Sequence, residues 1–261
     1  MKKAKGDYIY FIDSDDWLTN RDVFALFVQH LSAPIDFLGA GLQLVYDGGK
    51  ISGYNTTKHP SQITEITGNH ILEALVDNVI PAVAGNFMYS SEFLRKNKLL
   101  FKEGIKHEDE LWMFHVSICS KKCLLLPHIT YNYYRSNPNS TMNNRQISNL
   151  ENIEKIIEEI LETNDILQLH NKIGEEKFSE YLDRFYYIIL NDENLTKSST
   201  EWKNFYKKLK KTYIQSKTSH VIKKFSLPSS LAYILLLEKS KRPSKIRNRF
   251  YRKLLSKFSV V

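Results

Sequence analysis

Residues 4–18 read Ala-Lys-Gly-Asp-Tyr-Ile-Tyr-Phe-Ile-Asp-Ser-Asp-Asp-Trp-Leu, and this stretch decides the fold that we predict for the chain. The apolar run Tyr8–Ile12 ends abruptly at three carboxylates, those of Asp13, Asp15 and Asp16. A short apolar run between polar flanks predicts a strand that is buried on both faces. Open α/β sheets bind their ligands just beyond the carboxyl ends of such strands. We therefore expect a binding site at this acidic turn.

The three carboxylates predict a cation site. Negative charges at this spacing repel one another unless a cation is shared among them. Hard oxygen ligands suit Mg²⁺ or Mn²⁺, which complete their coordination with waters and substrate phosphates. The alternative is that Asp-Ser-Asp-Asp caps a following helix, because Ser and Asp are favoured at helix N-termini. The first interpretation predicts a metal–diphosphate site, and the second predicts a structural turn.

Composition places the chain among ordinary globular proteins. It has 261 residues, of which 42% are hydrophobic and 25% are charged. No apolar run approaches the roughly 18–20 residues that a bilayer-spanning helix needs. The only cysteines, Cys119 and Cys123, are typical of small core residues in a reducing cytoplasm rather than of a disulfide framework. These features predict a cytoplasmic location.

The positive charge lies in the second part of the chain. Residues 1–150 carry 15 basic and 15 acidic side chains, whereas residues 151–261 carry 22 and 14. Residues 239–257 contain nine basic side chains and no acidic one. Apolar residues recur here at every fourth position: Ile246, Phe250, Leu254 and Phe258. This pattern predicts a basic amphipathic helix on an anionic membrane, at the inner face of the cell membrane. A helix that packs on its own domain is the alternative, and nucleic acid is disfavoured because no nucleic-acid motif accompanies the charge.

The predicted secondary structure divides the chain into residues 1–145, with mixed strands and helices, and residues 146–261, with helices alone. In the first part we predict strands at 8–12, 36–46, 50–54, 82–89 and 129–134, and helices at 68–78, 90–97 and 108–120. In the second part, apolar residues at a spacing of three and four from Leu150 to Leu161 predict one buried helical stripe. Further helices are predicted near 175–191, 199–215, 229–240 and 244–258.

A second acidic cluster comprises Glu108, Asp109 and Glu110. These residues fall in the first turn of a predicted helix, where acids stabilise the helix dipole. That structural role is one interpretation. The other is that one carboxylate accepts a proton from a bound substrate as a general base.

The two clusters, in this order, resemble those of family 2 glycosyltransferases. The run from Ala4 to Leu18 is similar to the metal-binding region of that family, and His107–Glu110 is similar to the acidic motif that carries the catalytic base. The segments 86–104 and 131–141 also fit the family pattern, so the resemblance covers residues 1–145. Bacterial enzymes that build capsular and lipopolysaccharide sugars are the most similar in style.

The resemblance implies an α/β fold, a partial glycosyltransferase-A mixed sheet flanked by helices, followed by an all-helical C-terminal region. It also implies an inverting transfer from a nucleotide-diphosphate sugar to a saccharide or lipid-linked saccharide acceptor, with Mn²⁺ or Mg²⁺ as cofactor. Asp13 and Asp15 would form the Asp-x-Asp motif, with Asp15 the direct metal ligand and Asp13 also contacting the substrate. Asp109 would be the base and Glu108 would orient the acceptor. Arg135 and Ser140 would contact the diphosphate, unless they are simply surface residues.

One departure from the family pattern raises alternatives. Family members carry further β-α units before the motif, and this chain begins three residues before it. We therefore expect an N-terminally truncated catalytic region with an open sheet edge. The chain would then be an inactive fragment, half of a split enzyme completed by another chain or by a homo-oligomer, or a non-catalytic module that binds membrane or a partner. A metal-dependent hydrolase is the alternative enzyme class.

Overall fold

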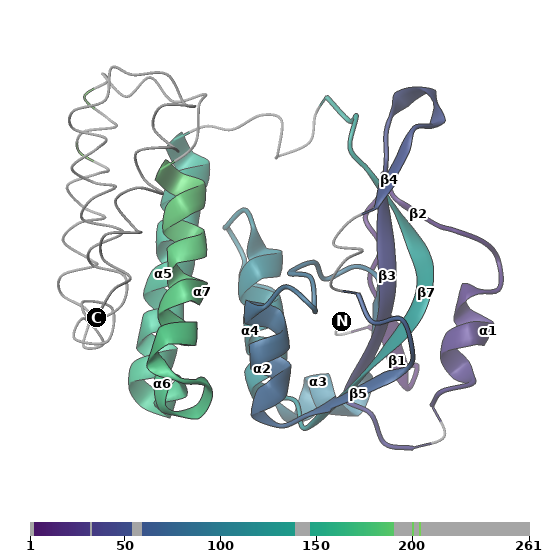
Figure 1. The fold of residues 1–261 in the computed structure, drawn as a ribbon, viewed down its shortest axis with the longest axis horizontal. Coiled ribbons are helices and arrows are strands. Elements are labelled where there is room, and N and C mark those ends of the chain that lie inside the picture. Colours follow the sequence, from purple (N-terminus) through teal and green to yellow (C-terminus); the bar gives the residue numbers. More distant parts are fainter. Residues whose placement is uncertain are drawn as a thin grey trace. The chain divides into compact units, whose positions relative to one another are not determined.

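The computed structural model describes residues 3–31, 33–53, 59–138 and 147–190, together with residues 200 and 204 (Figure 1). The chain divides into two compact units, Met1–Asn152 and Ile153–Val261. Each unit is considered by itself.

The first unit is built on a mixed β-sheet. Its strands in the described residues are Tyr8–Tyr10 (β1), Trp17–Leu18 (β2), Phe37–Val45 (β3), Ile51–Gly53 (β4), Thr64–Thr67 (β5), Phe87–Ser90 (β6) and Lys122–Tyr134 (β7). They pair in the order β1-β6-β3-β7-β2, while β4 adds to β3 and β5 adds to β7. The β3–β7 pair is parallel, and the other pairs are antiparallel.

The two strands of the parallel pair are mostly apolar where both of their faces are covered. Strand β3 is buried along most of its length, and β7 has its longest buried run at Cys123–Leu126. Gly39 lets β3 approach its neighbour β6, since a Cβ atom there would fall 2.2 Å from the Phe87 ring. A register shift between Gly39 and Leu42 then carries the parallel pairing on to Val45.

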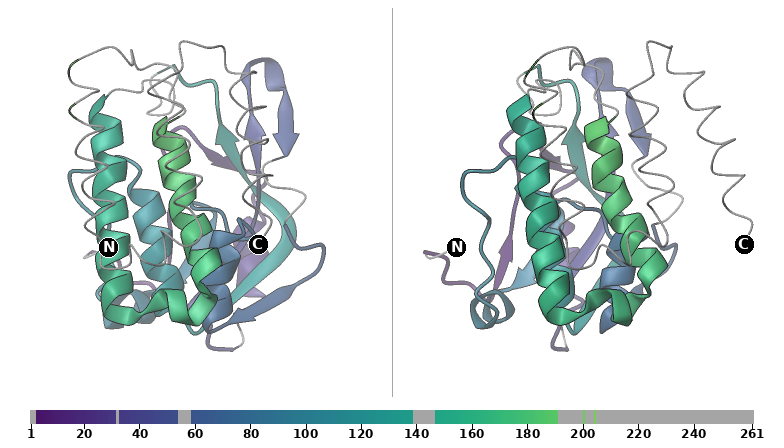
Figure 2. Two further views of the ribbon diagram at one scale, coloured as in Figure 1. Left: turned by 60° about the vertical axis from the view of Figure 1, so that its left-hand side comes forward. Right: turned by 90° about the vertical axis from the view of Figure 1, so that its left-hand side faces the viewer.

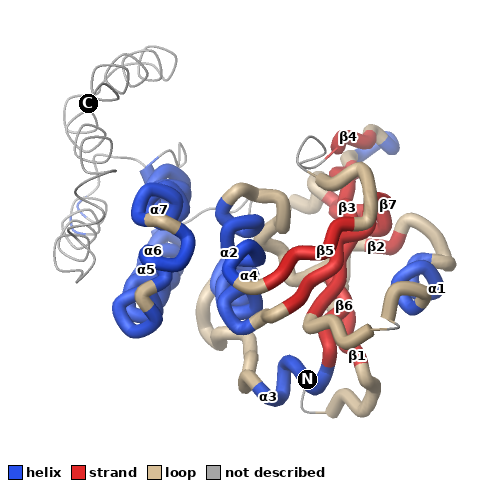
Figure 3. The backbone as a smooth tube through the Cα atoms, turned by 60° about the horizontal axis from the view of Figure 1, so that its bottom comes forward, coloured by secondary structure: helices blue, strands red, loops and turns tan. Residues whose placement is uncertain are grey.

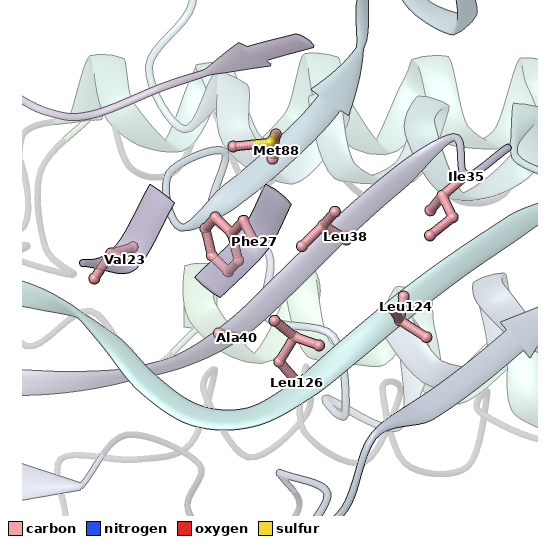
Figure 4. Close-up of a cluster of buried hydrophobic side chains, with 8 residues drawn as sticks. All are labelled: Val23, Phe27, Ile35, Leu38, Ala40, Met88, Leu124 and Leu126. Carbon is pink, nitrogen blue, oxygen red and sulfur yellow. The ribbon is translucent and has the colours of Figure 1, made fainter. Parts of the chain in front are cut away.

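Helices cover both faces of this sheet. The short helix Val23–Val28 (α1) lies on one face, and Asn69–Val76 (α2) and Glu108–Cys119 (α4) lie on the other (Figures 1 and 3). The core beneath α1 joins its two buried residues to Ile35 and to side chains of β3, β6 and β7 (Figure 4): Val23, Phe27, Ile35, Leu38, Ala40, Met88, Leu124 and Leu126. Helix α3 (Ser91–Lys96) follows β6 directly, and its N-cap Ser90 accepts a hydrogen bond from the Phe93 N–H at 3.3 Å, as the sequence predicts.

The second unit is helical where it is described. Its helices are α5 (Ile147–Leu167), whose first six residues belong to the first unit, α6 (Leu169–Ile173) and α7 (Glu175–Leu190). Helices α5 and α7 run side by side (Figure 2). The predicted stripe of α5 is confirmed by five buried residues: Ile153, Ile156, Ile157, Ile160 and Leu161. None of the helices in the described residues is long and apolar enough to cross a membrane. The helices predicted at 199–215, 229–240 and 244–258 lie outside the described residues, save for positions 200 and 204.

The expected fold class, a mixed sheet flanked by helices, is confirmed. Helix α1 and strands β2 and β5 were not predicted, and three predicted strands differ in detail. Strand β1 is half-buried at the sheet edge instead of buried on both faces. Strand β7 begins at Lys122, seven residues before the predicted start at Ile129. Strand β6 begins at Phe87, later than the predicted Ala82, because buried Asn86 adopts a positive φ of 67° that breaks the extended backbone.

Candidate active site

The acidic turn lies where several element ends meet. Strands β1, β3 and β7 run in the same direction and β6 runs opposite to them. The carboxyl ends of β1 and β7 therefore share one end of the sheet with the N-terminus of β6. Asp13–Asp16 follows β1 at that end, as expected for ligand sites in α/β sheets.

The turn is held by hydrogen bonds from β7. The Asp16 N–H donates to the Asp13 carbonyl at 3.2 Å, which closes the turn. The Asp16 carboxylate accepts from the Tyr134 N–H through Oδ1 and from the Tyr131 hydroxyl through Oδ2, both at 2.8 Å. The next helix begins only at Val23 with Asp22 as its N-cap. The alternative that Asp-Ser-Asp-Asp caps a following helix is therefore wrong.

Burial and mutual repulsion raise the pKa values of these carboxyl groups. The pKa of Asp16 is raised to about 6, first by desolvation and further by Asp13 and Asp15, while its two hydrogen bonds work in the opposite direction. The pKa of Asp13 is also raised above its ordinary value, first by partial desolvation and then by Asp15 and Glu108. A bound cation would relieve this repulsion.

The second acidic cluster lies close to the acidic turn that follows β1. His107, at a φ of 64°, starts helix α4, so that Glu108 and Asp109 occupy its first turn. The Asp109 carboxylate accepts a hydrogen bond from the Ala84 N–H, just before β6. Its pKa is raised to about 7, first by desolvation, then by the negative charges of Glu108 and Asp13. The structure thus brings Asp13 within electrostatic reach of Asp15, Glu108 and Asp109.

An aromatic cluster joins the two acidic segments. Phe11, two residues before Asp13, packs edge-on against Trp112 of α4, with ring centroids 5.6 Å apart. Phe101 stacks on Trp112 at 4.3 Å, and buried Tyr89 meets Trp112 edge-on at 5.5 Å. These rings fix the end of β1 against the start of α4. They also supply the apolar surroundings in which a nearby carboxylate is poorly hydrated.

The remaining predicted site residues are less well placed for a role. The Arg135 N–H continues the sheet by donating to the Val45 carbonyl at 2.8 Å, and the guanidinium lies 5.6 Å from the centroid of the Tyr133 ring. Ser140 lies outside the described residues. Contact of either residue with a diphosphate stays a prediction.

Several residues of the site were not predicted to have a role, although they lie in the segment 131–141 that fits the family pattern. Asn137 donates through its amide to Asp15 Oδ2 at 2.6 Å, and Tyr131 and the Tyr134 backbone hold Asp16. The tyrosines of Tyr-Asn-Tyr-Tyr read as ordinary strand residues. Only the pairing of β7 beside the acidic turn shows which of them face it.

The carboxylates fit the predicted metal in kind. Within the ranges that the structure describes, no group of three or more His, Cys, Asp or Glu side chains is arranged to hold a metal ion. Magnesium-type ions in phosphate-transfer sites use one or two carboxylates and take their other ligands from substrate phosphates and water. Asp13 and Asp15 supply two such carboxylates. The pKa of Asp13 is raised, and a bound cation would lower it by favouring the charged form.

Comparison with known proteins finds similarity in structure but not in sequence. No family model and no curated protein sequence matches the chain. Among solved structures, residues 1–349 of the glycosyltransferase TarS from S. aureus, in complex with UDP-GlcNAc, match with a TM-score of 0.64 and 16% identity over 90% of this chain. The same TarS fragment with UDP matches with a TM-score of 0.61 and 20% identity, also over 90% of this chain.

The chain has the fold of a glycosyltransferase. It covers 65% of the TarS fragment that holds UDP-GlcNAc, 64% of the fragment that holds UDP and 39% of the longer TarS chain, whose TM-score is 0.58. The chain thus spans less than two thirds of the proteins it resembles. At these identities the likeness shows the fold alone.

The raised pKa of Asp109 predicts that Asp109→Asn stabilises the protein at high pH. An unfolded Asp loses its proton near pH 4, whereas folded Asp109 holds it up to about pH 7. Between these values the unfolded state binds fewer protons, so the free energy of unfolding falls as pH rises. Removing the charge should raise that free energy by about 1–2 kcal/mol at pH 8 and have little effect at pH 4.

Urea denaturation of both proteins at pH 4 and pH 8 measures this difference. Glu103→Gln, which removes one exposed charge from the loop before α4, is the matched control. An Asp109→Asn protein that is less stable than the parent at pH 8 would contradict the prediction.

Proposed function

We propose that this chain is an inverting glycosyltransferase of the family 2 type. It transfers a sugar from a nucleotide-diphosphate donor to a saccharide or lipid-linked saccharide acceptor of a cell-surface polymer, of capsular or lipopolysaccharide type. The observation that carries the proposal is the convergence of Asp13, Asp15 and Asp109 at one end of a glycosyltransferase fold.

In the proposed mechanism Asp109 is the general base. Its carboxylate takes the proton of the acceptor hydroxyl while that oxygen bonds to the anomeric carbon and the bond from this carbon to the diphosphate breaks. A single displacement inverts the anomeric configuration and requires no covalent enzyme intermediate. A base with a pKa near 7 suits this task at neutral pH, because it is both partly ionised and a good proton acceptor. Glu108, its neighbour in the first turn of α4, orients the acceptor.

Asp13 and Asp15 hold the donor side of the site. Their carboxylates would bind Mn²⁺ or Mg²⁺, with Asp15 as the direct ligand. When bound, such an ion neutralises the charge that develops on the departing diphosphate. The Asn137 amide orients Asp15 from the loop after β7, and Arg135 and Ser140 would contact the diphosphate. Because the TarS structures contain UDP or UDP-GlcNAc, a uridine-diphosphate sugar is the donor that we test first.

The first expected outcome is a metal-dependent rise in melting temperature with one nucleotide diphosphate. Thermal unfolding is measured with Mn²⁺ and, in turn, UDP, GDP, ADP and CDP. We expect a shift of several degrees with UDP and Mn²⁺ together, since ligands that bind only the folded state stabilise it. Asp15→Ala should abolish the shift. Asp22→Ala, in an exposed aspartate before α1, should keep it. A shift that survives Asp15→Ala would remove Asp15 from the metal site.

The second expected outcome concerns transfer itself. Asp109→Asn should lower kcat about 10²- to 10⁴-fold, because the acceptor proton then lacks a base. Wild-type kcat/KM should rise with pH through about 7, since Asp109 acts only when ionised. Anomeric NMR of the product measures inversion directly. A retained configuration, or an Asp109→Asn enzyme with most of its activity, would rule out this role for Asp109. Release of free sugar without transfer would indicate the hydrolase alternative.

The basic segment 239–257, which lies outside the described residues, supports a peripheral location on the cytoplasmic face of the membrane. Nine cations and interleaved aromatic residues favour anionic lipid surfaces. We expect the chain to sediment with anionic vesicles and not with neutral ones. Removal of residues 241–261 should abolish this binding. Unchanged binding after the removal would assign the membrane contact to another part of the chain.

A second candidate function is a non-catalytic or complementing module. Among the described residues β1 pairs with β6 alone, which leaves its other edge open. Apolar side chains near this strand are exposed: 50% of Ile12, which follows β1, and 44% of Phe24, which contacts Tyr10 of β1, are accessible to solvent. An open strand edge next to apolar side chains can receive a strand from another chain or from a second copy. A cooperatively folded protein that shows no shift with any nucleotide would favour this candidate.

A further inference from the structure

The Tyr131 hydroxyl joins the two ends of the acidic turn. It donates to Asp16 Oδ2 at 2.8 Å and accepts from the Asp13 N–H at 3.3 Å. A tyrosine hydroxyl has one proton to donate, so this donor is used on Asp16. Tyr131 is 3% exposed and belongs to β7, more than a hundred residues from the turn in sequence.

The surrounding backbone fixes the place of this hydroxyl. A Cβ atom at Gly85 would lie 2.9 Å from the hydroxyl oxygen and 3.1 Å from the ring carbon that bears it, so only glycine leaves room. Asn86, which follows, is fully buried and bonds on both sides. Its amide nitrogen donates to the Ala40 carbonyl, and its carbonyl oxygen accepts from the Thr130 hydroxyl at 2.7 Å. The hydrogen bond between Asn86 and Thr130 thus holds the adjacent residues, Gly85 and Tyr131, next to each other.

The carboxylate of Asp16 has a different role from those of Asp13 and Asp15. Both of its oxygens accept hydrogen bonds from β7, one from Tyr131 and one from the Tyr134 N–H. Asp16 therefore serves as an anchor for the turn, and the two other aspartates remain for a ligand. Among the described residues, the Asp15 side chain accepts its hydrogen bond from the Asn137 amide, in the loop after β7.

We propose that Tyr131 is a positioning residue for the metal–diphosphate site. By bridging the Asp16 carboxylate and the Asp13 N–H, its hydroxyl fixes the acidic turn in the shape that presents Asp13 and Asp15 together to the cation. This inference rests on the proposed function, because it assigns Tyr131 a part in binding the donor. It requires no contact of Tyr131 with the substrate.

The experiment is Tyr131→Phe in the full chain, which removes one oxygen atom and keeps the ring. Binding of Mn²⁺ in the presence of UDP is followed by electron paramagnetic resonance. Hydrogen–deuterium exchange of the peptide that contains residues 13–16 is followed by mass spectrometry, and melting temperature is measured alongside. We expect Mn²⁺ affinity to fall about tenfold, since a hydrogen bond to a charged group is lost. Exchange at 13–16 should quicken, while the melting temperature falls by only a few degrees.

The matched control is Tyr134→Phe. It removes another tyrosine–aspartate hydrogen bond of the same strand, that of the Tyr134 hydroxyl to Asp47 at 2.5 Å, and leaves the backbone N–H on Asp16 in place. Mn²⁺ affinity and exchange at 13–16 should stay at the wild-type level in this variant. Gly85→Ala displaces the Tyr131 hydroxyl from the other side and should reproduce the loss of affinity. It keeps the proposal testable if Tyr131→Phe fails to fold.

A double-mutant cycle separates positioning from general damage. Asp16→Asn alone should weaken Mn²⁺ binding, and adding Tyr131→Phe should weaken it little further, because both changes remove the same anchor. Fully additive losses would overturn the proposal. So would a Tyr131→Phe protein that binds Mn²⁺ and UDP as the wild type does, and this would leave the proposed function intact. A wild-type chain that binds neither ligand would instead overturn the proposed function, and the donor-binding role of Tyr131 with it.

Discussion

The parallel pairing of β3 with β7 is the constraint on which the rest of the structure depends. Strand β3 meets β7 from Phe37 to Val45, while β2 and β5 pair with the other edge of β7. Since β7 also runs in the direction of β1, its carboxyl end arrives at the acidic turn. A strand of thirteen residues is long enough to bury its first half in the core and to place its second half at the site. The core and the candidate active site are thus parts of one ladder.

The site concentrates carboxylates in surroundings that disfavour their charge. The pKa values of Asp13, Asp16 and Asp109 are all raised, in each case first by desolvation. A fold selected for stability alone would place neutral groups here, because each ionised carboxylate costs free energy that its neighbours increase. The aromatic packing of Phe11, Phe101 and Trp112 keeps the acidic segments together despite this repulsion. Such a concentration of unfavourable charge is typical of functional sites.

Local signals allowed part of the fold to be predicted. The Ser90 cap, the acidic first turn of α4 and the apolar stripe of α5 depend on residues three or four apart, so the sequence displays them directly. Helix α1 and strands β2 and β5 are too short to show a period. The start of β7 was missed because Leu124–Leu126 reads equally well as the end of a buried helix and as a strand. Only its partner β3, far away in sequence, selects the extended form.

The sequence by itself determined which chemical groups follow β1 and which begin α4: three aspartates in one turn and three acids in another. It therefore predicted the acidic character of the site and the two segments that build it. The tertiary structure decided the part each carboxylate plays. Asp16 is an anchor because Tyr131 and the Tyr134 N–H reach it from β7. The pKa of Asp109 is raised to about 7 because the carboxyl group is desolvated and lies near the charges of Glu108 and Asp13. Desolvation and charge repulsion depend on distance in space, and no short-range pattern in the sequence carries that distance.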